Sequence, residues 1–409
     1  MLVEEIKNNN KIILQARKSK RKYLYDYHAQ IKDSSGNKDL FGKGGAISFT
    51  REDLAKNKAV SEALERYCGS HVFNKLERGS FKDVKSQALD PQKIIYFTES
   101  QYIKKFRYKK FSSEAEIDWI SGYSLTNRRK VLVPAFAVYL GYNRRVPKSE
   151  FFSPTTSSGL ALGTTLETAI LRAIFELIER DSIMITWLTK RNTYRLDLDT
   201  VTMPELLSLK DCIELENLKI EVCILTVYKE VASVIAIVYN PKKVFPNVSF
   251  GFSTEDNIEL AVLKAIEEAM MVRNTLELEQ ERHGKLGKIR ESQIKTFLDH
   301  VVYYSFPQHK IKWDFFLKGD LCSLENITKK LNISKVNLSE VMDLFKGEVI
   351  YINLTSNEVN KMGYKVVRVI IPELQPLFEN HTAMVLNRKR LDKFVAKNYE
   401  LNTDPHPYG

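Results

Sequence analysis

The stretch SSGLALGTTLETAILRAIFELIERD, at residues 157–181, holds the most informative pattern in the chain. It opens with small residues and glycines. Thr164 and Glu167 then form a Thr-x-x-Glu capping box, which predicts the start of a helix. Apolar residues follow at helical spacing, so one stripe of this helix is expected to be buried. The helix also carries an acidic pair, Glu176 and Glu179, near the end of the stretch.

Predicted strands and helices alternate on both sides of this helix. A glycine-rich turn at 42–45 leads into a helix with Thr50 as its N-cap, which reaches about Tyr67. A third long helix is expected from about 255 to 281. Runs of β-branched and aromatic residues predict strands at 131–142, 219–227, 232–239 and 365–371. This interleaving indicates an α/β, or intermixed α+β, fold.

The size and composition of the chain indicate a globular protein with acidic partners. Its 409 residues exceed the size at which a single core usually stops growing, so we expect one multi-lobed domain. Hydrophobic residues make up 44% and charged residues 28%, which excludes a disordered or fibrous chain. The net charge of +11 favours nucleotides, nucleic acid, anionic lipid or an acidic peptide as partners.

The cysteines and the apolar segments indicate a cytoplasmic protein. The four cysteines form no Cys-x-x-Cys pair, so neither a zinc ribbon nor a redox motif is supported. Isolated thiols suit a reducing cytosol. The first residues contain no apolar region typical of a secretory signal, and the longest apolar runs are too short to span a bilayer. We therefore expect no membrane partner.

One short pattern, Glu-x-x-Glu-Arg, occurs twice, at 62–66 and at 176–180. Both copies lie on predicted helices. Residues three apart on a helix are neighbours, so each copy can present two carboxylates to one point in space. A hard cation such as Mg²⁺ requires oxygen ligands of this kind and commonly shares them with nucleotide phosphates. The repeat therefore favours a magnesium site.

An ordinary structural role is the alternative for each of these residues. The first Glu and the Arg of each copy form an i,i+4 pair in the favourable order, which is typical of surface salt bridges. On the third helix, Lys264 and Glu268 could likewise be a pair on a solvated face. The glycine-rich turn at 42–45 could hold a phosphate, but no Walker motif occurs in the sequence. The residues alone leave both interpretations open.

Taken together, these segments resemble the signature motifs of the YcaO family. Residues 157–181 are similar to the family's Ser-Asn-Gly-Leu-Ala stretch and its Glu-x-x-Glu-Arg-Asp helix. Residues 42–67 resemble the earlier Glu-x-x-Glu-Arg-Tyr helix, with Lys58 where the family has a serine. Residues 264–273 resemble a third motif, and 365–377 resemble the closing strand. The matches follow the family order and span most of the chain.

The resemblance implies a YcaO-type ATP-binding fold and an enzyme that activates peptide backbone amides with ATP and Mg²⁺. In the best-known branch, a Cys, Ser or Thr side chain of a ribosomally made precursor peptide attacks the preceding carbonyl. The oxyanion takes the γ-phosphate, and loss of phosphate leaves a thiazoline or oxazoline, as in bacteriocin biosynthesis. We therefore expect an ATP-dependent cyclodehydratase. Relatives that form thioamides or amidines remain an alternative.

The resemblance also implies roles for individual residues. The expected metal ligands are Glu62, Glu65, Glu176 and Glu179. The expected nucleotide-binding residues are Lys58, Arg66, Glu167, Arg180, Lys264, Glu268 and Arg273. Because this branch often ends in Pro-x-Pro-x-Pro, a catalytic role is expected for Pro405, Pro407 and Gly409. The tail is expected to be ordered, with the Gly409 carboxylate directed toward the helix of the second Glu pair.

The same comparison suggests how the chain is divided and what it binds. We expect a basic N-terminal segment at 1–40, a YcaO catalytic domain at 41–395 and a proline-containing tail at 396–409. Expected partners are a precursor peptide, a leader-binding E1-like or ThiF-like subunit and a flavin-dependent dehydrogenase, and a homodimer is left open. Two alternatives remain, a catalytically silent scaffold and a nucleic-acid-binding protein. The second rests on basic residues at 103–111 and 386–390.

Overall fold

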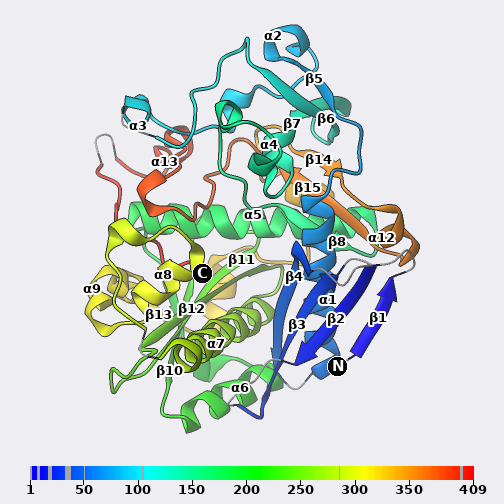
Figure 1. Cartoon of the computed structure of the whole chain (residues 1–409). Helices are drawn as coiled ribbons and strands as arrows, with labels where there is room; N and C mark the ends of the chain where they lie inside the picture. Colours follow the sequence, from blue (N-terminus) through cyan, green and yellow to red (C-terminus); the bar gives the residue numbers. More distant parts are fainter. Residues whose placement is uncertain are drawn as a thin grey trace.

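A long helix, α5 (Leu166–Thr189), organises the fold. The computed structural model of the chain describes residues 2–6, 10–16, 21–32, 38–49, 51–103, 106–284, 286–396 and 399–409. Figure 1 shows α5 crossing the middle of the molecule, between a six-stranded sheet above and a five-stranded sheet below. A four-stranded sheet lies to the right of the five-stranded sheet and below the six-stranded one. The expected α/β fold is confirmed.

The N-terminal region forms an antiparallel sheet that the sequence analysis did not predict. Its strands follow chain order and are β1 (Leu2–Ile6), β2 (Asn10–Ala16), β3 (Leu24–Lys32) and β4 (Lys38–Phe49). Helix α1 (Glu52–Ser70) packs against β3 and β4. The expected N-cap of α1, Thr50, lies outside the described residues.

The predicted glycine-rich turn is wrong, because residues 42–45 lie inside strand β4. The glycines allow a close approach instead of a reversal of the chain. A Cβ atom on Gly44 would come within 2.6 Å of the Ala63 nitrogen and still nearer to the Ala59 carbonyl oxygen. The absent side chain therefore lets β4 lie directly on α1, and no phosphate-binding loop forms there.

The six-stranded sheet has the order β5-β6-β14-β15-β8, with β7 paired to β6. Its strands are β5 (Glu77–Ser80), β6 (Glu116–Ser124), β7 (Arg129–Pro134), β8 (Leu160–Gly163), β14 (Ile350–Asn353) and β15 (Lys365–Ile370). The strand predicted at 131–142 is wrong in its second half. Pro134 has no N–H to continue the ladder, and the chain turns into the short helix α4 (Ala135–Val138).

The five-stranded sheet has the order β12-β11-β10-β9-β13. Its strands are β9 (Tyr194–Leu196), β10 (Lys219–Ile224), β11 (Ala232–Tyr239), β12 (Val248–Glu255) and β13 (Leu321–Cys322). Helices α6 (Pro204–Leu215) and α7 (Ile258–His283) cover one face, and the second half of α5 covers the other. Strand β11 is buried on both faces, which explains its unbroken apolar run.

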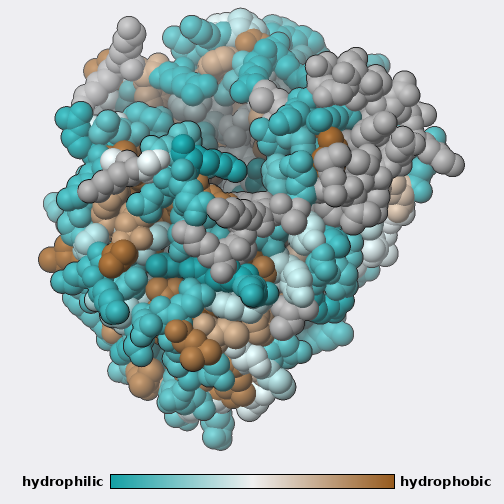
Figure 2. Space-filling view, turned by 60° about the horizontal axis from the view of Figure 1, so that its bottom comes forward, coloured by the Kyte–Doolittle hydropathy of each residue, from teal (hydrophilic) through white to brown (hydrophobic). Residues whose placement is uncertain are grey.

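Shorter helices connect these layers. They are α2 (Phe81–Val84), α3 (Glu99–Ile103), α8 (Phe297–Tyr304), α9 (Lys310–Trp313), α10 (Leu324–Lys330), α11 (Leu338–Met342), α12 (Asn357–Lys361) and α13 (Arg388–Leu391). In the described part of the chain, no helix is both long and apolar enough to cross a membrane. The face seen in Figure 2 is largely hydrophilic, with its hydrophobic residues in separate small spots.

Helix α5 belongs to two cores at once. Its first half packs with β8 and β15, and its second half packs with β11 and β12. Its N-terminus differs from the expected capping box by one residue. Thr165 is the N-cap, and Thr168 completes the box, because both hydroxyls reach the backbone N–H groups of the first turn. Glu167 is thereby left exposed on that turn.

Candidate functional site

Three helices bring five carboxylates into one region. Helix α1 contributes Glu62 and Glu65, α5 contributes Glu176 and Glu179, and α7 contributes Glu268. Their charges interact across the helices. In addition to burial, the negative charges of Glu176 and Glu62 raise the pKa of Glu65. The charge of Glu268 likewise raises the pKa of Glu179, and the charge of Glu62 raises the pKa of Glu268. The two copies of the repeated motif therefore face each other.

Backbone N–H groups of three strands, and of the turn that precedes β8, hold four of these carboxylates in place. The carboxylate of Glu62 accepts from the Gly45 N–H at 2.7 Å, and that of Glu176 accepts from the Gly159 N–H at 2.6 Å. Two further pairs repeat this arrangement, Leu162 N–H to Glu65 at 3.2 Å and Phe252 N–H to Glu268. Each helix is thus fixed against the edge or end of a strand by its own acidic side chain.

Burial, and then neighbouring negative charge, raises the pKa values of Glu65 and Glu179, and burial raises that of Glu268. Burial raises the pKa of Glu179 to about 8, and the neighbouring Glu268 adds to the shift. Burial also raises the pKa of Glu268 to about 7, although the Phe252 N–H and Arg180 oppose it. The pKa of Glu65 lies well above its usual value because of burial and, next, of Glu176. A cation at this position would relieve the repulsion.

Two arginines from the repeated motif lie beside the carboxylates. Arg66 pairs with Glu62 at 2.6 Å, and Arg180 pairs with Glu176 at 2.8 Å. Arg180 also donates to the Ser158 hydroxyl at 2.7 Å. Burial opposes its charge, but Glu176, Tyr408 and Glu179 together outweigh burial, so the pKa of Arg180 is raised. The Nε atoms of both arginines are buried and have no hydrogen-bond partner among the described residues.

A third arginine, Arg368 of β15, was not predicted. Its side chain is buried, with 5% of the residue exposed, and only its Nη2 donates, to the Ala137 carbonyl at 3.2 Å. Its Nε and Nη1 have no partner in the described residues. Burial lowers the pKa of Arg368 to about 10, although nearby Glu176 favours the charged form. A lone arginine inside the apolar run KVVRVII was the available sequence signal.

Four of the predicted nucleotide-binding residues do not pair with the carboxylates and arginines described above. Lys58 pairs with Glu267 at 3.2 Å, which also accepts from the Phe49 N–H. Lys264 pairs with Glu255. The remaining two are Glu167, exposed on the first turn of α5, and Arg273.

Arg273 points to a different neighbourhood. Its Nε lies 3.5 Å from Glu277, whose carboxylate also binds Arg21. Burial lowers the pKa of Arg273 to about 10, and the charge of Arg21 adds to this effect. The structure therefore does not bring Arg273 together with Arg180. Residues five apart lie on different faces of an α-helix, because each turn takes about 3.6 residues. Arg273 and Glu268 therefore project from different faces of α7.

The C-terminal tail is ordered and buried against the site. The Tyr408 hydroxyl donates to Glu179 at 3.1 Å, and Arg180 lies over the Tyr408 ring, 5.7 Å from its centre. His406 stacks on His300, with ring centres 3.9 Å apart. Gly409 is exposed and lies next to Val301. Tyr408 is the tail residue that reaches the second Glu pair, and the direction of the Gly409 carboxylate stays a prediction.

The donor set of this region fits a metal ion together with a polyphosphate. In the described ranges no three acidic, histidine or cysteine side chains already stand in a ligating arrangement, since N–H groups and arginines occupy the carboxylate oxygens. However, the donors are all carboxylates, which Mg²⁺ prefers, and a bound cation would favour their charged forms against burial. The unpaired guanidinium N–H groups need an acceptor, and an anion is the strongest one.

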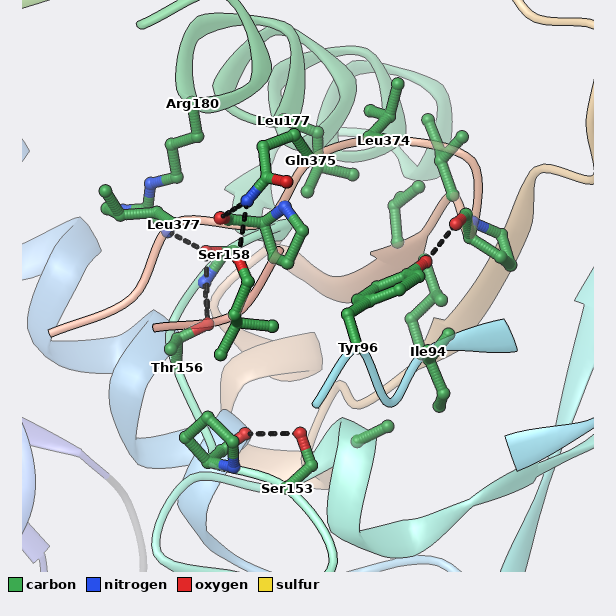
Figure 3. Close-up of a pocket in the computed structure, with 18 of the residues that line it drawn as sticks. Ile94, Tyr96, Ser153, Thr156, Ser158, Leu177, Arg180, Leu374, Gln375 and Leu377 are labelled. Atoms are coloured by element: carbon green, nitrogen blue, oxygen red, sulfur yellow. Dashed lines mark hydrogen bonds between the residues drawn. The ribbon is translucent and has the colours of Figure 1, made fainter. Parts of the chain in front are cut away.

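A cavity of about 130 Å³ adjoins the site. Figure 3 shows Arg180 and Leu177 of α5 on one side, and Tyr96 and the segment carrying Leu374 on another. Arg368 also lines it. Most of the other lining side chains are apolar. The cavity therefore has an apolar body and a cationic part that borders the carboxylates.

Comparison with known proteins agrees with this geometry. A family model described as YcaO cyclodehydratase, ATP- and Mg²⁺-binding, matches residues 49–375. This chain belongs to the YcaO family. A search of curated proteins finds no match. The YcaO fold of the chain is also found among solved structures.

Three of those structures show how far the similarity extends. A heterocyclase in complex with substrate and cofactor is 18% identical with a TM-score of 0.76, over 97% of this chain and 55% of that chain. YcaO from Methanopyrus kandleri, bound with AMPPCP and Mg²⁺, is 19% identical with a TM-score of 0.60, over 89% and 86%. A chain of the E. coli microcin synthetase McbBCD complex with pro-MccB17 bound is 14% identical with a TM-score of 0.67, over 97% and 96%. This YcaO chain thus spans about half the length of the first heterocyclase.

Proposed function

We propose that this YcaO protein uses ATP to cyclodehydrate Cys, Ser or Thr residues of a ribosomal precursor peptide. The observation that carries the proposal is the meeting of two Glu-x-x-Glu-Arg helices, α1 and α5, around unpaired guanidinium groups. Carboxylates and arginines together suit a metal-bound triphosphate. Phosphoryl transfer asks a protein mainly for positioning and for stabilisation of charge, and this arrangement offers both.

The reaction balances without a nucleophile from the protein. The thiol or hydroxyl of the peptide adds to the preceding carbonyl carbon and loses its proton, and the resulting oxyanion takes the γ-phosphoryl group of ATP, releasing ADP. Loss of the amide proton and departure of phosphate then form the C=N bond of the azoline ring. The carbonyl oxygen leaves in phosphate, so ATP removes the equivalent of one water.

In this proposal the acidic residues hold the metal and the arginines hold phosphate. Glu62, Glu65, Glu176 and Glu179 are the proposed metal ligands, with Glu268 beside them. When bound, Mg²⁺ would supply Lewis-acid stabilisation of the phosphates. Arg66 and Arg180 are the proposed phosphate-binding residues, because each pairs with a motif carboxylate and also has an unpaired Nε. Lys58, Lys264 and Glu167 are proposed as more distant contributors to nucleotide binding.

The tail is proposed to assist the cyclisation step. Prolines at 405 and 407 stiffen a segment that is buried along most of its length and ends beside Glu179. We propose that Pro405, Pro407 and Gly409 hold this end in place during proton transfer at the amide. Deleting Pro405–Gly409 should then lower the cyclisation rate much more than it lowers ATP affinity. Full activity of the truncated chain would contradict this role.

Partners follow from the proposed substrate. McbBCD is a complex that has been solved with pro-MccB17 bound. By analogy, we propose that this chain works with a leader-binding E1-like or ThiF-like subunit, and that a flavin-dependent dehydrogenase can follow it to oxidise the azoline.

The experiment that tests the function follows both products together. The chain, its precursor peptide and the partner subunit are incubated with ATP and Mg²⁺, while ADP release and peptide mass are recorded. We expect one water lost from the peptide for each phosphate released. ATP turnover with no mass change in the peptide, or a gain of sulfur, would contradict the proposal.

A further inference from the structure

Most of the polar side chains that line the cavity beside Arg180 already have hydrogen-bond partners. The Tyr96 hydroxyl donates to the Pro372 carbonyl, and the Thr156 hydroxyl donates to Ser158. The Gln375 side chain donates to two carbonyls and accepts from the Asn387 N–H. The dashed lines in Figure 3 mark several of these bonds. Among the described lining residues, the polar side-chain atoms without a partner are guanidinium N–H donors.

These donors belong to Arg368 and Arg180. Arg368 leaves Nε and Nη1 unpaired, and Arg180 leaves Nε unpaired, although both arginines line the cavity. Guanidinium N–H groups can only donate, so a fitting ligand must bring an acceptor oxygen, preferably one that carries negative charge. A ligand oxygen would supply the partner that these buried donors lack. Arg368 is therefore poised for a ligand.

The rest of the cavity requires an apolar group. Leu177, Val369, Ile371 and Leu374 belong to its lining. An apolar protein cavity of about 150 Å³ is large enough to bind benzene. A volume of about 130 Å³ therefore suits one apolar side chain of the size of leucine or phenylalanine.

We propose that this cavity binds the peptide residue that precedes the modified Cys, Ser or Thr. Its carbonyl oxygen, the one that becomes the oxyanion, binds Arg368, and its side chain fills the apolar body of the cavity. This inference rests on the proposed function and adds a substrate-binding residue and a sequence preference to it. Arg368 then stabilises negative charge on the oxygen until the phosphoryl group is transferred.

The adenine base of ATP is the competing occupant. Adenine presents an amino donor as well as ring acceptors, so its pocket needs a free acceptor. Among the acceptor side chains that line this cavity, Ser158 already accepts from Arg180 and Gln375 from Asn387. A peptide carbonyl with an apolar side chain satisfies the unpaired Arg368 donors and the apolar lining, and competition with AMPPCP separates it from adenine.

The test uses two small molecules that probe the arginine donors and the apolar lining of the cavity. N-acetyl-L-leucine carries a carboxylate in place of the oxyanion and an isobutyl group, and N-acetylglycine carries only the carboxylate. We expect the full chain to bind N-acetyl-L-leucine at least tenfold more tightly than N-acetylglycine, measured by NMR titration with AMPPCP and Mg²⁺ present. Arg368→Gln should weaken both probes at least fivefold. Ala137→Leu adds bulk at the cavity lining and should remove the preference for leucine.

AMPPCP affinity is the matched control for Ala137→Leu, and thermal melting shows whether each variant is folded. We expect AMPPCP affinity to stay within about twofold in Ala137→Leu. Equal binding of the two probes by the unmodified chain would overturn the inference. So would a tenfold loss of AMPPCP affinity in Ala137→Leu together with competition between AMPPCP and N-acetyl-L-leucine, because the cavity would then hold adenine. Failure of the unmodified chain to bind AMPPCP would instead refute the proposed function.

Discussion

At the scale of single residues, Glu179 lies where the α5, α7 and tail contributions meet. It accepts from Tyr408 and interacts with Glu268 and Arg180. Glu179→Gln keeps the shape but removes the charge that a metal ion would need. We expect ATP turnover to fall by about 100-fold or more, as is typical when a charge-stabilising group is lost. ADP release is the measurement.

A matched variant separates this effect from loss of folding. Glu279→Gln, near the far end of α7, removes a carboxylate whose partners are Arg282 and His283 at the surface. It should leave turnover within about twofold, since surface ion pairs contribute little. If Glu179→Gln keeps full turnover while its far-ultraviolet circular dichroism is unchanged, the metal assignment is wrong.

The arginines make a second prediction at this scale. Arg180→Met should raise the apparent KM for ATP by about tenfold or more, because a charge-assisted contact to phosphate is lost. Arg273→Met should instead alter thermal stability. It should leave the KM for ATP within about twofold, because Arg273 pairs with Glu277 rather than with the five carboxylates of the site. Steady-state kinetics on both variants checks this. An equal rise in KM for the two variants would restore Arg273 to the site.

The grouping of site residues could be predicted from the sequence where their spacing on a helix places them on one face. Two acids three apart must share a helix face, so Glu62 and Glu65, like Glu176 and Glu179, could be grouped from spacing alone. Arg368 was missed because it stands alone in a strand, where no periodic partner marks it. The contribution of Tyr408 depends on how the tail lies across three other elements, which no local pattern encodes.

At the scale of elements, the contact between β4 and α1 makes the sharpest prediction. Gly44→Ala places a methyl group against the backbone of α1, where neither neighbour can move independently. We expect unfolding free energy to fall by about 1–3 kcal/mol or more, measured by urea denaturation. Gly79→Ala is the control, because a Cβ there meets nothing within 4 Å. Equal stability of the two variants would show that β4 and α1 are not held in close contact.

Helix positions were predictable to within a few residues, whereas the sheets were not. The predicted helices correspond to α1, α5 and α7, because apolar periodicity and polar caps are local signals. Strand β4 was taken for a turn because its glycines are typical of turns, although here they serve close packing. In the described residues the N-terminal strands pair with one another, and the basic residues at 17–22 between them are typical of a solvated segment.

At the scale of the whole molecule, buried histidines tie stability to pH. His300 contacts the carbonyls of His406 and Glu379, and burial lowers its pKa to about 4. His406 and His381 also face it, with pKa values lowered by burial, and Asp299 partly opposes the shift. Unfolded histidine, with a pKa of about 6.5, binds its proton first as the pH falls. Stability is therefore lost from about pH 6.5 down to about pH 4.

The size of this effect can be measured by chemical denaturation across that range. A shift of about 2.5 pKa units corresponds to about 3 kcal/mol for His300 alone. His300→Asn cannot take up the proton and should flatten this part of the curve. A profile that is the same in both proteins would show that His300 titrates normally in the folded state.

The way strands clamp the acidic side chains has a consequence for synthesis on the ribosome. Gly45, Leu162 and Phe252 each fix a carboxylate on a helix that is encoded before or after them, and Tyr408 fixes another near the end of the chain. The pieces of the catalytic centre are thus translated hundreds of residues apart. A nascent chain cannot assemble them early, so nucleotide-binding competence should appear only after α7, which carries Glu268, has left the exit tunnel. Until then, the growing polypeptide is expected to be unable to consume ATP.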